Sequence, residues 1–224
     1  VTAVTSRGRL VPIYRVDTPD KAVAISFDAT WGTDLTDEIL EILKENNVYT
    51  TFFLAGQWID KYPDYVVKIA QHGHEIGNHS YSHPHMNSLT SAGVIQELER
   101  NGEMIRDLVG EQPLIFRPPF GEYNNTVIQA ASSIGYKTIQ WSVDSLDWKN
   151  STSEQIYARV MSQIKPGDIV LFHNAAPGTP QAIRRLIPEL KKQGYDIVPV
   201  SKIILDGDYY IDHDGTQKRR PGGN

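Results

Sequence analysis

The sequence predicts an α/β domain built on parallel strands, folded either as an α/β barrel or as a doubly wound sheet. From Lys21 onward, short apolar segments alternate with longer segments of helical periodicity. Repeated strand-helix units of this kind are typical of parallel strands with helices packed outside them. The chain has 224 residues, of which 40% are hydrophobic and 22% charged, as in an ordinary globular domain.

Seven strand candidates and six helix candidates make up the alternation. The strand candidates are residues 22–27, 50–56, 74–80, 113–119, 137–145, 168–174 and 196–201. The helix candidates between them are residues 34–47, 58–73, 88–110, 124–135, 152–164 and 179–194. Ser and Thr residues precede the third and fifth helices as expected N-caps, and four helices end at a glycine, namely Gly73, Gly110, Gly135 and Gly194. We expect residues 1–20 to be an N-terminal extension, residues 21–206 the folded domain and residues 207–224 a C-terminal tail.

The composition excludes several classes of site. The formal net charge of −5 argues against a nucleic-acid-binding surface, and the basic residues 218–220 are typical of a solvated chain end. Because the chain has no cysteine, disulfides, thiolate metal sites and cysteine nucleophiles are excluded, and any metal must be held by His, Asp or Glu. No segment reaches the roughly 18 apolar residues of a membrane span. The chain begins at Val1, so we expect a processed form that contacts a membrane only through a removed N-terminal anchor. We also expect the protein to be a monomer.

Reactive side chains gather at the predicted strand ends, where parallel α/β folds build their active sites. These residues are Asp28, His79, Arg117, Asp144, Asp147 and His173. Asp28 follows an apolar strand, so its carboxylate is expected at the mouth of the fold in a partly desolvated setting that suits a general base. The alternative is an N-cap for the next helix, a role for which Asp34 is better placed.

Four of the seven histidines lie within residues 74–85. His79 and His83 are four positions apart and can share one metal ion if the residues between them turn helically. The alternative is a polar loop whose histidines only form hydrogen bonds. The remaining histidines of this region are expected to be structural or exposed, namely His72, His74 and His85.

Two further motifs carry candidate catalytic groups. His173 ends a strongly apolar strand, and an imidazole there suits an acid that protonates a leaving group, although a core histidine bonded to a carbonyl is equally consistent. After Arg117, two prolines stiffen the backbone and preset the direction of the Phe120 N–H, as an oxyanion donor requires, while the guanidinium orients a base. The alternative here is a simple turn with a surface ion pair.

Aromatic residues accompany the same segments, namely Trp31, Trp141, Trp148 and Tyr123. Exposed aromatic faces in a groove bind sugar rings, whereas aromatic residues near strands more often belong to the core. We expect Trp148 and Trp31 to line a groove.

Taken in order, these segments resemble the five motifs of the polysaccharide deacetylase family, the NodB-homology domain of carbohydrate esterase family 4. The matching segments are SFDATWG (26–32), HSYSH (79–83), RPPFG (117–121), DSLDW (144–148) and LFH (171–173). Residues 12–32 further resemble the sporulation-associated branch of that family, found in spore-forming bacteria.

The resemblance implies a distorted (β/α) barrel of about seven parallel strands, with residues 21–206 as the catalytic domain. It implies a divalent ion, zinc or else cobalt or nickel, held by His79 and His83. The other implied roles are Asp28 as base, Arg117 orienting Asp28, the Phe120 N–H as oxyanion donor, His173 as acid, Asp147 tuning His173, and Trp148 and Leu171 lining the substrate pocket.

One position departs from the family pattern. The first motif of the family has two adjacent carboxylates, the base and then a metal ligand, whereas here Asp28 is followed by Ala29. An alanine cannot bind a metal, so the sequence predicts weak metal binding unless Asp28, Asp34 or water completes the coordination shell.

The implied activity is metal-dependent N-deacetylation of N-acetylated amino sugars in a polysaccharide outside the cytoplasm. We expect the polymer to be peptidoglycan of the cell wall or spore envelope, or a chitin-like chain. One alternative is a glycan-binding or scaffolding protein that lacks turnover because of Ala29. Another is an esterase that removes O-acetyl groups from xylan, since the two reactions need the same oxyanion stabilisation.

Overall fold

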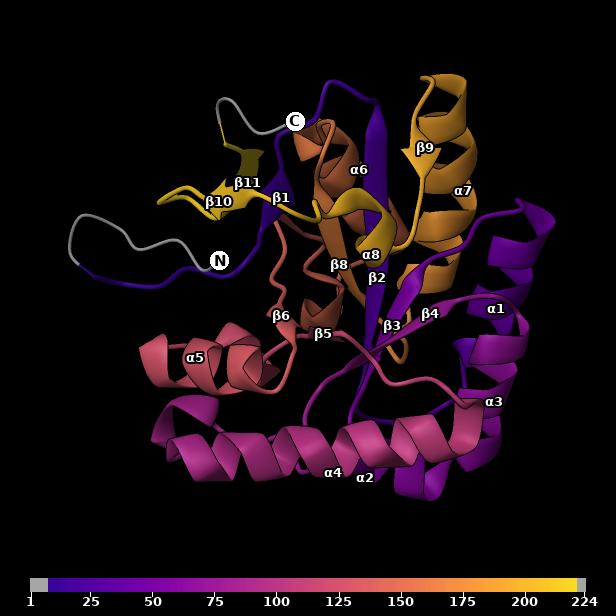
Figure 1. Ribbon diagram of the computed structural model, residues 1–224. Coiled ribbons are helices and arrows are strands. Elements are labelled where there is room, and N and C mark those ends of the chain that lie inside the picture. The colour runs from indigo at the N-terminus through magenta and orange to yellow at the C-terminus, as the bar shows by residue number, and fades with distance from the viewer. Residues whose placement is uncertain (1–7, 221–224) are drawn as a thin grey trace.

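A curled sheet of parallel strands forms the centre of the protein in the computed structural model, which describes residues 8–220 (Figure 1). Seven strands run in the order β6-β5-β4-β3-β2-β8-β7, and β9 also pairs with β2. Their bounds are β2 (Ala22–Ala29), β3 (Thr51–Leu54), β4 (Glu75–Asn78), β5 (Ile115–Phe116), β6 (Lys137–Thr138), β7 (Val143–Asp144), β8 (Ile169–His173) and β9 (Asp196–Ile197). The predicted distorted barrel of about seven parallel strands is confirmed.

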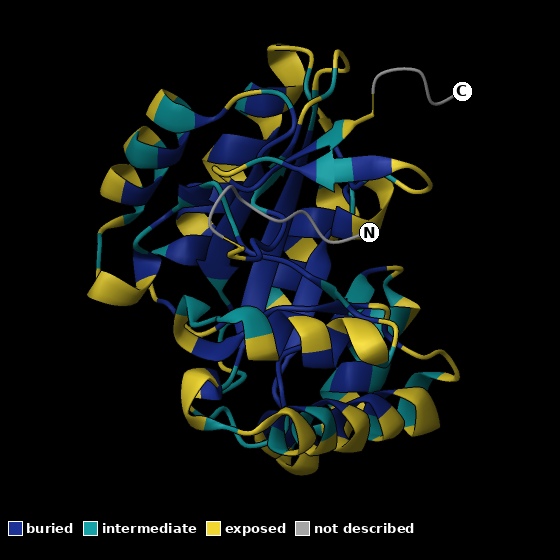
Figure 2. Cartoon of the chain, turned by 60° about the vertical axis from the view of Figure 1, so that its left-hand side comes forward, coloured by how far each residue is buried: buried dark blue, intermediate teal, exposed yellow. Residues whose placement is uncertain are grey.

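Helices cover the outside of this sheet and turn their buried faces toward it (Figure 2). They are α1 (Thr36–Glu45), α2 (Gly56–Lys61), α3 (Pro63–Gln71), α4 (Ser91–Val109), α5 (Asn125–Ser133), α6 (Ser153–Gln163), α7 (Thr179–Lys192) and the short α8 (Val200–Ile203). The expected helix 58–73 is divided between α2 and α3, because Pro63 lacks an N–H and begins a new helix at its first turn. Thr152 caps α6 in a full capping box with Gln155.

The central strand β2 separates two parts of the core. Val23, Ile25 and Ala29 alternate on its outer face and join the apolar cluster under the helices. Ala24 belongs to a second cluster inside the barrel, together with Phe53 of β3. Because the side chains of a strand alternate, Asp28 shares the inward face with Ala24, while Ala29 shares the outer face with Ile25.

The barrel sheet is closed by the N-terminal segment rather than by a strand ladder. The expected strand 137–145 is interrupted, and its two parts, β6 and β7, lie at opposite ends of the sheet. Ile13 forms a β-bridge with Ile139, and Arg15 forms one with Asp168 at the start of β8, so the segment lies across the opening.

A small second sheet flanks the barrel, formed by β1 (Arg15–Val16), β11 (Thr216–Arg219) and β10 (Tyr209–Ile211) in that order (Figure 1). Residues 1–7 and 221–224 of the expected extension and tail lie outside the described residues. The division at residues 20 and 206 stays a prediction.

A buried polar network fixes the end of β4, immediately before His79. The Asn78 amide nitrogen donates to Leu98 O (2.8 Å) and to the Tyr136 hydroxyl (2.9 Å). The Asn101 amide nitrogen of α4 donates to Asn78 Oδ1 and to Leu54 O, both at 2.9 Å. Both asparagines are fully buried, so these bonds have no competition from water.

We predict that Asn101→Ala lowers the free energy of unfolding by about 2–3 kcal/mol, because it removes two buried hydrogen bonds and creates a cavity. Urea denaturation monitored by circular dichroism measures the change. Gln112→Ala is the control, since this exposed side chain donates to the same Tyr136 hydroxyl and its loss is expected to cost less than about 0.5 kcal/mol. Equal effects of the two substitutions would contradict the assignment.

Candidate active site

A pocket of about 440 Å³ opens at the C-terminal ends of the strands. Its lining includes Asp28, Trp31, His79, His83, Phe120, Trp148, Leu171 and His173, all of them sequence-predicted site residues. The two remaining predicted residues, Arg117 and Asp147, are buried at 0% and 1% exposure and act on pocket residues from behind. The structure therefore brings all ten predicted residues together.

Asp28 is held in the barrel mouth by a buried ion pair. Arg117 Nη1 donates to Asp28 Oδ1 at 2.8 Å and to Ser26 Oγ at 2.9 Å, while Nη2 donates to Gln140 O at 3.1 Å. Burial acts to raise the pKa of Asp28, but the Arg117 guanidinium, together with the neighbouring His79 and His173, outweighs it and holds the pKa below its usual range. The carboxylate is therefore ionised near neutral pH and can accept a proton.

His173 faces the pocket with Asp147 behind it. The Nδ1–H of His173 donates to Asp147 Oδ1 at 2.7 Å, and the backbone N–H of His173 donates to Asp147 Oδ2 at 2.8 Å. The Thr179 hydroxyl also donates a hydrogen bond to Asp147 Oδ2, at 2.6 Å. Burial acts to lower the pKa of His173, but the hydrogen bond and charge of Asp147 outweigh it and raise the pKa above its usual value. This arrangement is that of an oriented imidazole acid.

His79 and His83 lie side by side, with ring centroids 5.0 Å apart. They meet without the helical turn that their spacing suggested, because Ser80 and His83 both have left-handed backbone conformations, with φ of 63° and 54°. The Nδ1–H of His79 donates to Arg117 O at 2.7 Å, which turns Nε2 toward Asp28 Oδ2 at 3.6 Å. The turn is held by Glu97, which accepts the N–H groups of residues 81 and 82.

The donor chemistry of this pair fits a divalent ion of the zinc type. Burial lowers the pKa of His79 and lowers that of His83 to about 4, so both imidazoles are neutral, as metal ligands must be. The bond from His79 Nδ1 to a carbonyl is the kind of outer contact that orients metal-binding histidines.

The same site has one protein ligand fewer than a usual catalytic zinc centre and two fewer than a structural one. Ala29 is fully buried and packs in the apolar cluster outside the barrel. Within residues 8–220 there is no cluster of three or more His, Asp or Glu side chains arranged to hold a metal ion. Two imidazoles alone predict weak, exchangeable binding.

Exposed aromatic side chains form the rim of the pocket. Trp31, Phe120 and Trp148 are 66%, 56% and 54% exposed. The Phe120 ring packs against the rings of His83 and His85, with both centroid separations at 4.6 Å. The sequence predicted a role for the backbone N–H of Phe120. The structure shows that the Phe120 ring also lines the pocket, which the motif did not reveal. Trp141 and Asp144 also line the pocket.

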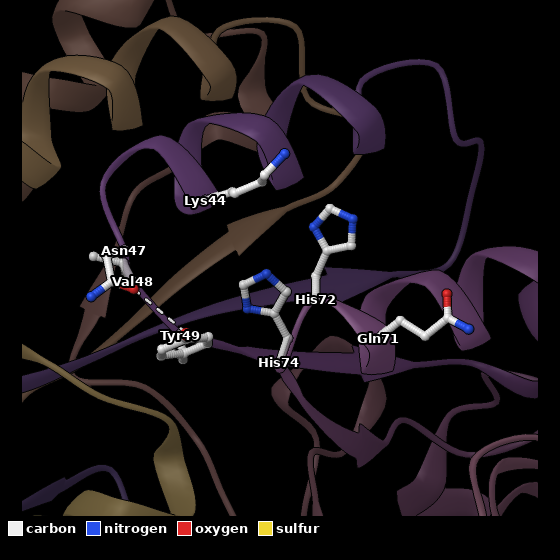
Figure 3. A pocket seen from close by; sticks show the side chains of 7 residues that line it. All are labelled: Lys44, Asn47, Val48, Tyr49, Gln71, His72 and His74. Atoms are coloured by element: carbon white, nitrogen blue, oxygen red, sulfur yellow. Dashed lines mark hydrogen bonds between the residues drawn. The ribbon is translucent and has the colours of Figure 1, made fainter.

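A second pocket, of about 300 Å³, lies near the beginnings of β3 and β4, at the other end of the strands (Figure 3). His74 is buried there, and its Nδ1 accepts the Thr50 N–H at 3.1 Å, while burial lowers its pKa to about 4. None of the described lining residues is Asp or Glu. This pocket offers no acid-base pair, and neither His74 nor its neighbour His72 lines the active-site pocket.

Across residues 8–220, no helix combines the length and apolar character needed to cross a membrane.

Comparison with known proteins places these features in a family. The chain is 35% identical over 193 residues to the uncharacterized protein YlxY of Bacillus subtilis, an alignment that covers 86% of this chain and 60% of YlxY. It is 34% identical over 196 residues to a peptidoglycan-N-acetylglucosamine deacetylase of Bacillus cereus, covering 85% of this chain and 92% of the relative. The chain thus spans less than two thirds of the first of these relatives.

Solved structures show the same fold. The structure of wild-type BA3943 from Bacillus anthracis, a CE4 family pseudoenzyme, superposes with a TM-score of 0.84 at 33% identity, covering 93% of this chain and 70% of that chain. A BA3943 mutant with restored enzymatic activity matches at the same TM-score of 0.84 and 34% identity, covering 93% of this chain and 72% of that chain. The family model for polysaccharide deacetylases matches residues 15–139, more than half of the chain. The chain therefore belongs to the polysaccharide deacetylase family.

Proposed function

We propose that the protein hydrolyses the N-acetyl group of an amino sugar in a polysaccharide, releasing acetate and a free amine. The observation that carries this proposal is the pairing, in one pocket, of an ionised carboxylate with an imidazole acid: Asp28 held by Arg117, and His173 held by Asp147. The pKa of Asp28 is lowered and that of His173 is raised, and a pair of groups shifted in opposite directions commonly serves as base and acid in hydrolysis.

In the first step, Asp28 accepts a proton from a water molecule whose oxygen attacks the acetamide carbonyl carbon. The Asp28 Oδ1 atom is engaged by Arg117, so Oδ2, which faces His79, is the atom free to take the proton. Developing negative charge on the carbonyl oxygen needs donors in the pocket wall, and we assign this role to the backbone N–H of Phe120.

In the second step, the C–N bond breaks and the departing nitrogen takes a proton from His173. The Nδ1 atom of His173 is bound by Asp147, so Nε2 delivers the proton. The carboxylate of Asp147 behind the ring stabilises the imidazolium and raises its pKa, which favours the protonated form that an acid needs.

A divalent ion bound by His79 and His83 supplies Lewis acidity toward the carbonyl oxygen when it is present. We propose zinc, with cobalt or nickel as substitutes, at an affinity reduced by the missing carboxylate at Ala29.

The proposed substrate is peptidoglycan or a similar N-acetylated glycan, outside the cytoplasm. The exposed rings of Trp31 and Trp148 provide faces for sugar rings beside the reacting groups. The Bacillus cereus relative is itself a peptidoglycan-N-acetylglucosamine deacetylase, which supports this choice of polymer.

A second function is favoured by one observation. Ala29 stands where the family has a carboxylate, and the similar BA3943 structure is that of a pseudoenzyme. A glycan-binding protein without turnover would retain the aromatic rim and the pocket, and it would bind the polymer saturably without forming product.

We predict that Asp28→Asn and His173→Ala each reduce acetate release from N-acetylglucosamine oligomers by about 100-fold or more, because each removes one of the proton-transferring groups. His72→Ala, at the opposite end of the strands, is the control and is expected to retain wild-type activity. Circular dichroism establishes that the variants are folded. Full activity in both site variants would rule out the mechanism.

The pH dependence is expected to report His173. As an acid, His173 must be protonated, so activity falls as the pH rises through its pKa, which Asp147 raises. We predict that Asp147→Asn moves this alkaline fall to lower pH, because burial then acts on the imidazole without the opposing carboxylate. The pH profile of kcat/KM measures the shift, with the exposed Asp64→Asn as control. An unchanged profile would contradict the role of Asp147.

We predict that Ala29→Asp binds zinc at least about tenfold more tightly than the wild type, because a carboxylate is costly in the apolar cluster that position 29 faces, and the end of β2 turns it toward His79 and His83, where it restores an anionic ligand. Since position 29 is fully buried, the new carboxylate should also destabilise the metal-free protein. Isothermal titration of zinc into chelator-treated protein measures the affinity, and melting curves with and without zinc measure the stability. Equal zinc affinities would show that another group already completes the wild-type site.

A further inference from the structure

Gln140 occupies the crossing between β6 and β7, where the barrel has no strand ladder. It is 1% exposed and belongs to none of the five motif segments. Its backbone and its side chain make hydrogen bonds to three residues in two separate segments of the chain, Ile13 in the N-terminal segment and both Arg117 and Gly121 in the motif that carries site residues.

The backbone of Gln140 fixes the guanidinium that holds Asp28. Its carbonyl accepts Arg117 Nη2 at 3.1 Å, and its N–H donates to Ile13 O at 2.7 Å. Arg117 Nε is buried without a hydrogen-bond partner in the described chain, so the terminal nitrogens alone set the orientation of the group. A movement of the Gln140 peptide therefore displaces the Arg117 side chain, which is bonded directly to Asp28.

The side chain of Gln140 fixes the opposite wall of the pocket. Its Nε2 donates to Gly121 O at 2.9 Å. Phe120 and Gly121 are consecutive left-handed residues, with φ of 59° and 67°, and such a conformation at a phenylalanine persists only where its surroundings hold it. At Gly121, a Cβ would lie 2.9 Å from the Trp141 ring, so the turn also has no room to rearrange around a larger residue.

We infer that Gln140 is a positioning residue that holds the Asp28–Arg117 pair and the Phe120 wall in one fixed arrangement. The inference rests on the proposed function, because it concerns the position of the proposed base, Asp28, relative to Phe120 in the pocket wall. Gln140 touches neither reacting group and acts through Arg117 and Gly121.

The test compares wild type with Gln140→Met, which keeps an unbranched side chain of similar length but has no donor for Gly121 O. Thr138→Val is the matched control, because Thr138 lies two residues earlier, is similarly buried, and its hydroxyl has no partner in the described chain. The first readout is ¹⁵N NMR of the Arg117 guanidinium. Loss of the bond to Gly121 O frees the Gln140 peptide, whose carbonyl accepts Arg117 Nη2. In Gln140→Met the Nη protons are therefore expected to exchange with solvent about tenfold faster, with no change in Thr138→Val.

The second readout is the affinity for tetra-N-acetylchitotetraose, which is expected to weaken about fivefold in Gln140→Met through the loosened Phe120 wall. Unchanged Arg117 exchange in Gln140→Met, or the same acceleration in Thr138→Val, overturns the inference. Acetate release is measured in parallel. If the wild type releases none, the proposed function fails, while the guanidinium readout still decides the role of Gln140.

Discussion

The buried ion pair between Asp28 and Arg117 is the constraint on which the rest of the site depends. A guanidinium that is fully enclosed must have a charged partner and hydrogen bonds, because an unpaired buried charge costs several kcal/mol. Ser26 and Gln140 supply further acceptors, and the Phe53 ring lies 4.1 Å from the guanidinium. The pair thus ties β2, β5 and the crossing after β6 to a single geometry at the barrel mouth.

This constraint also explains the division of roles between the two carboxylates. Asp28 and Asp147 are both buried, yet the cation beside Asp28 is permanent, whereas the partner of Asp147 is a titratable imidazole. The first arrangement produces an ionised carboxylate at the pocket surface, and the second raises the pKa of the imidazole and so favours its protonated form. Environment, rather than residue type, therefore separates the carboxylate proposed as base from the carboxylate that supports the proposed imidazole acid.

Much of this could be predicted from the sequence, because strand ends and helix caps are local signals. The apolar run before Asp28 and the run before His173 both proved to be barrel strands ending at the pocket. Closure of the barrel by Ile13 could not be predicted, since it depends on contacts between segments more than 100 positions apart. The interruption of the expected strand 137–145 follows from the same closure. The apolar pattern of these residues gives no sign of it.

The conformation of the turn from His79 to His83 was also beyond sequence reasoning. The spacing of His79 and His83 suggested a helical turn, but hydrogen bonds to the distant Glu97 stabilise left-handed residues instead. Likewise, alternation along β2 places Ala29 toward the helices, so the missing ligand is a packed methyl group and not an open vacancy.

The most direct test of the central claim is mass spectrometry of N-acetylglucosamine oligomers and peptidoglycan fragments incubated with the wild-type protein at increasing zinc, cobalt or nickel. The account predicts acetate loss from the glycan that increases with the concentration of the ion, as expected for a weakly bound metal. Saturable binding of the same glycans with no acetate loss at any concentration of any of the three ions would contradict it and would identify a glycan-binding protein.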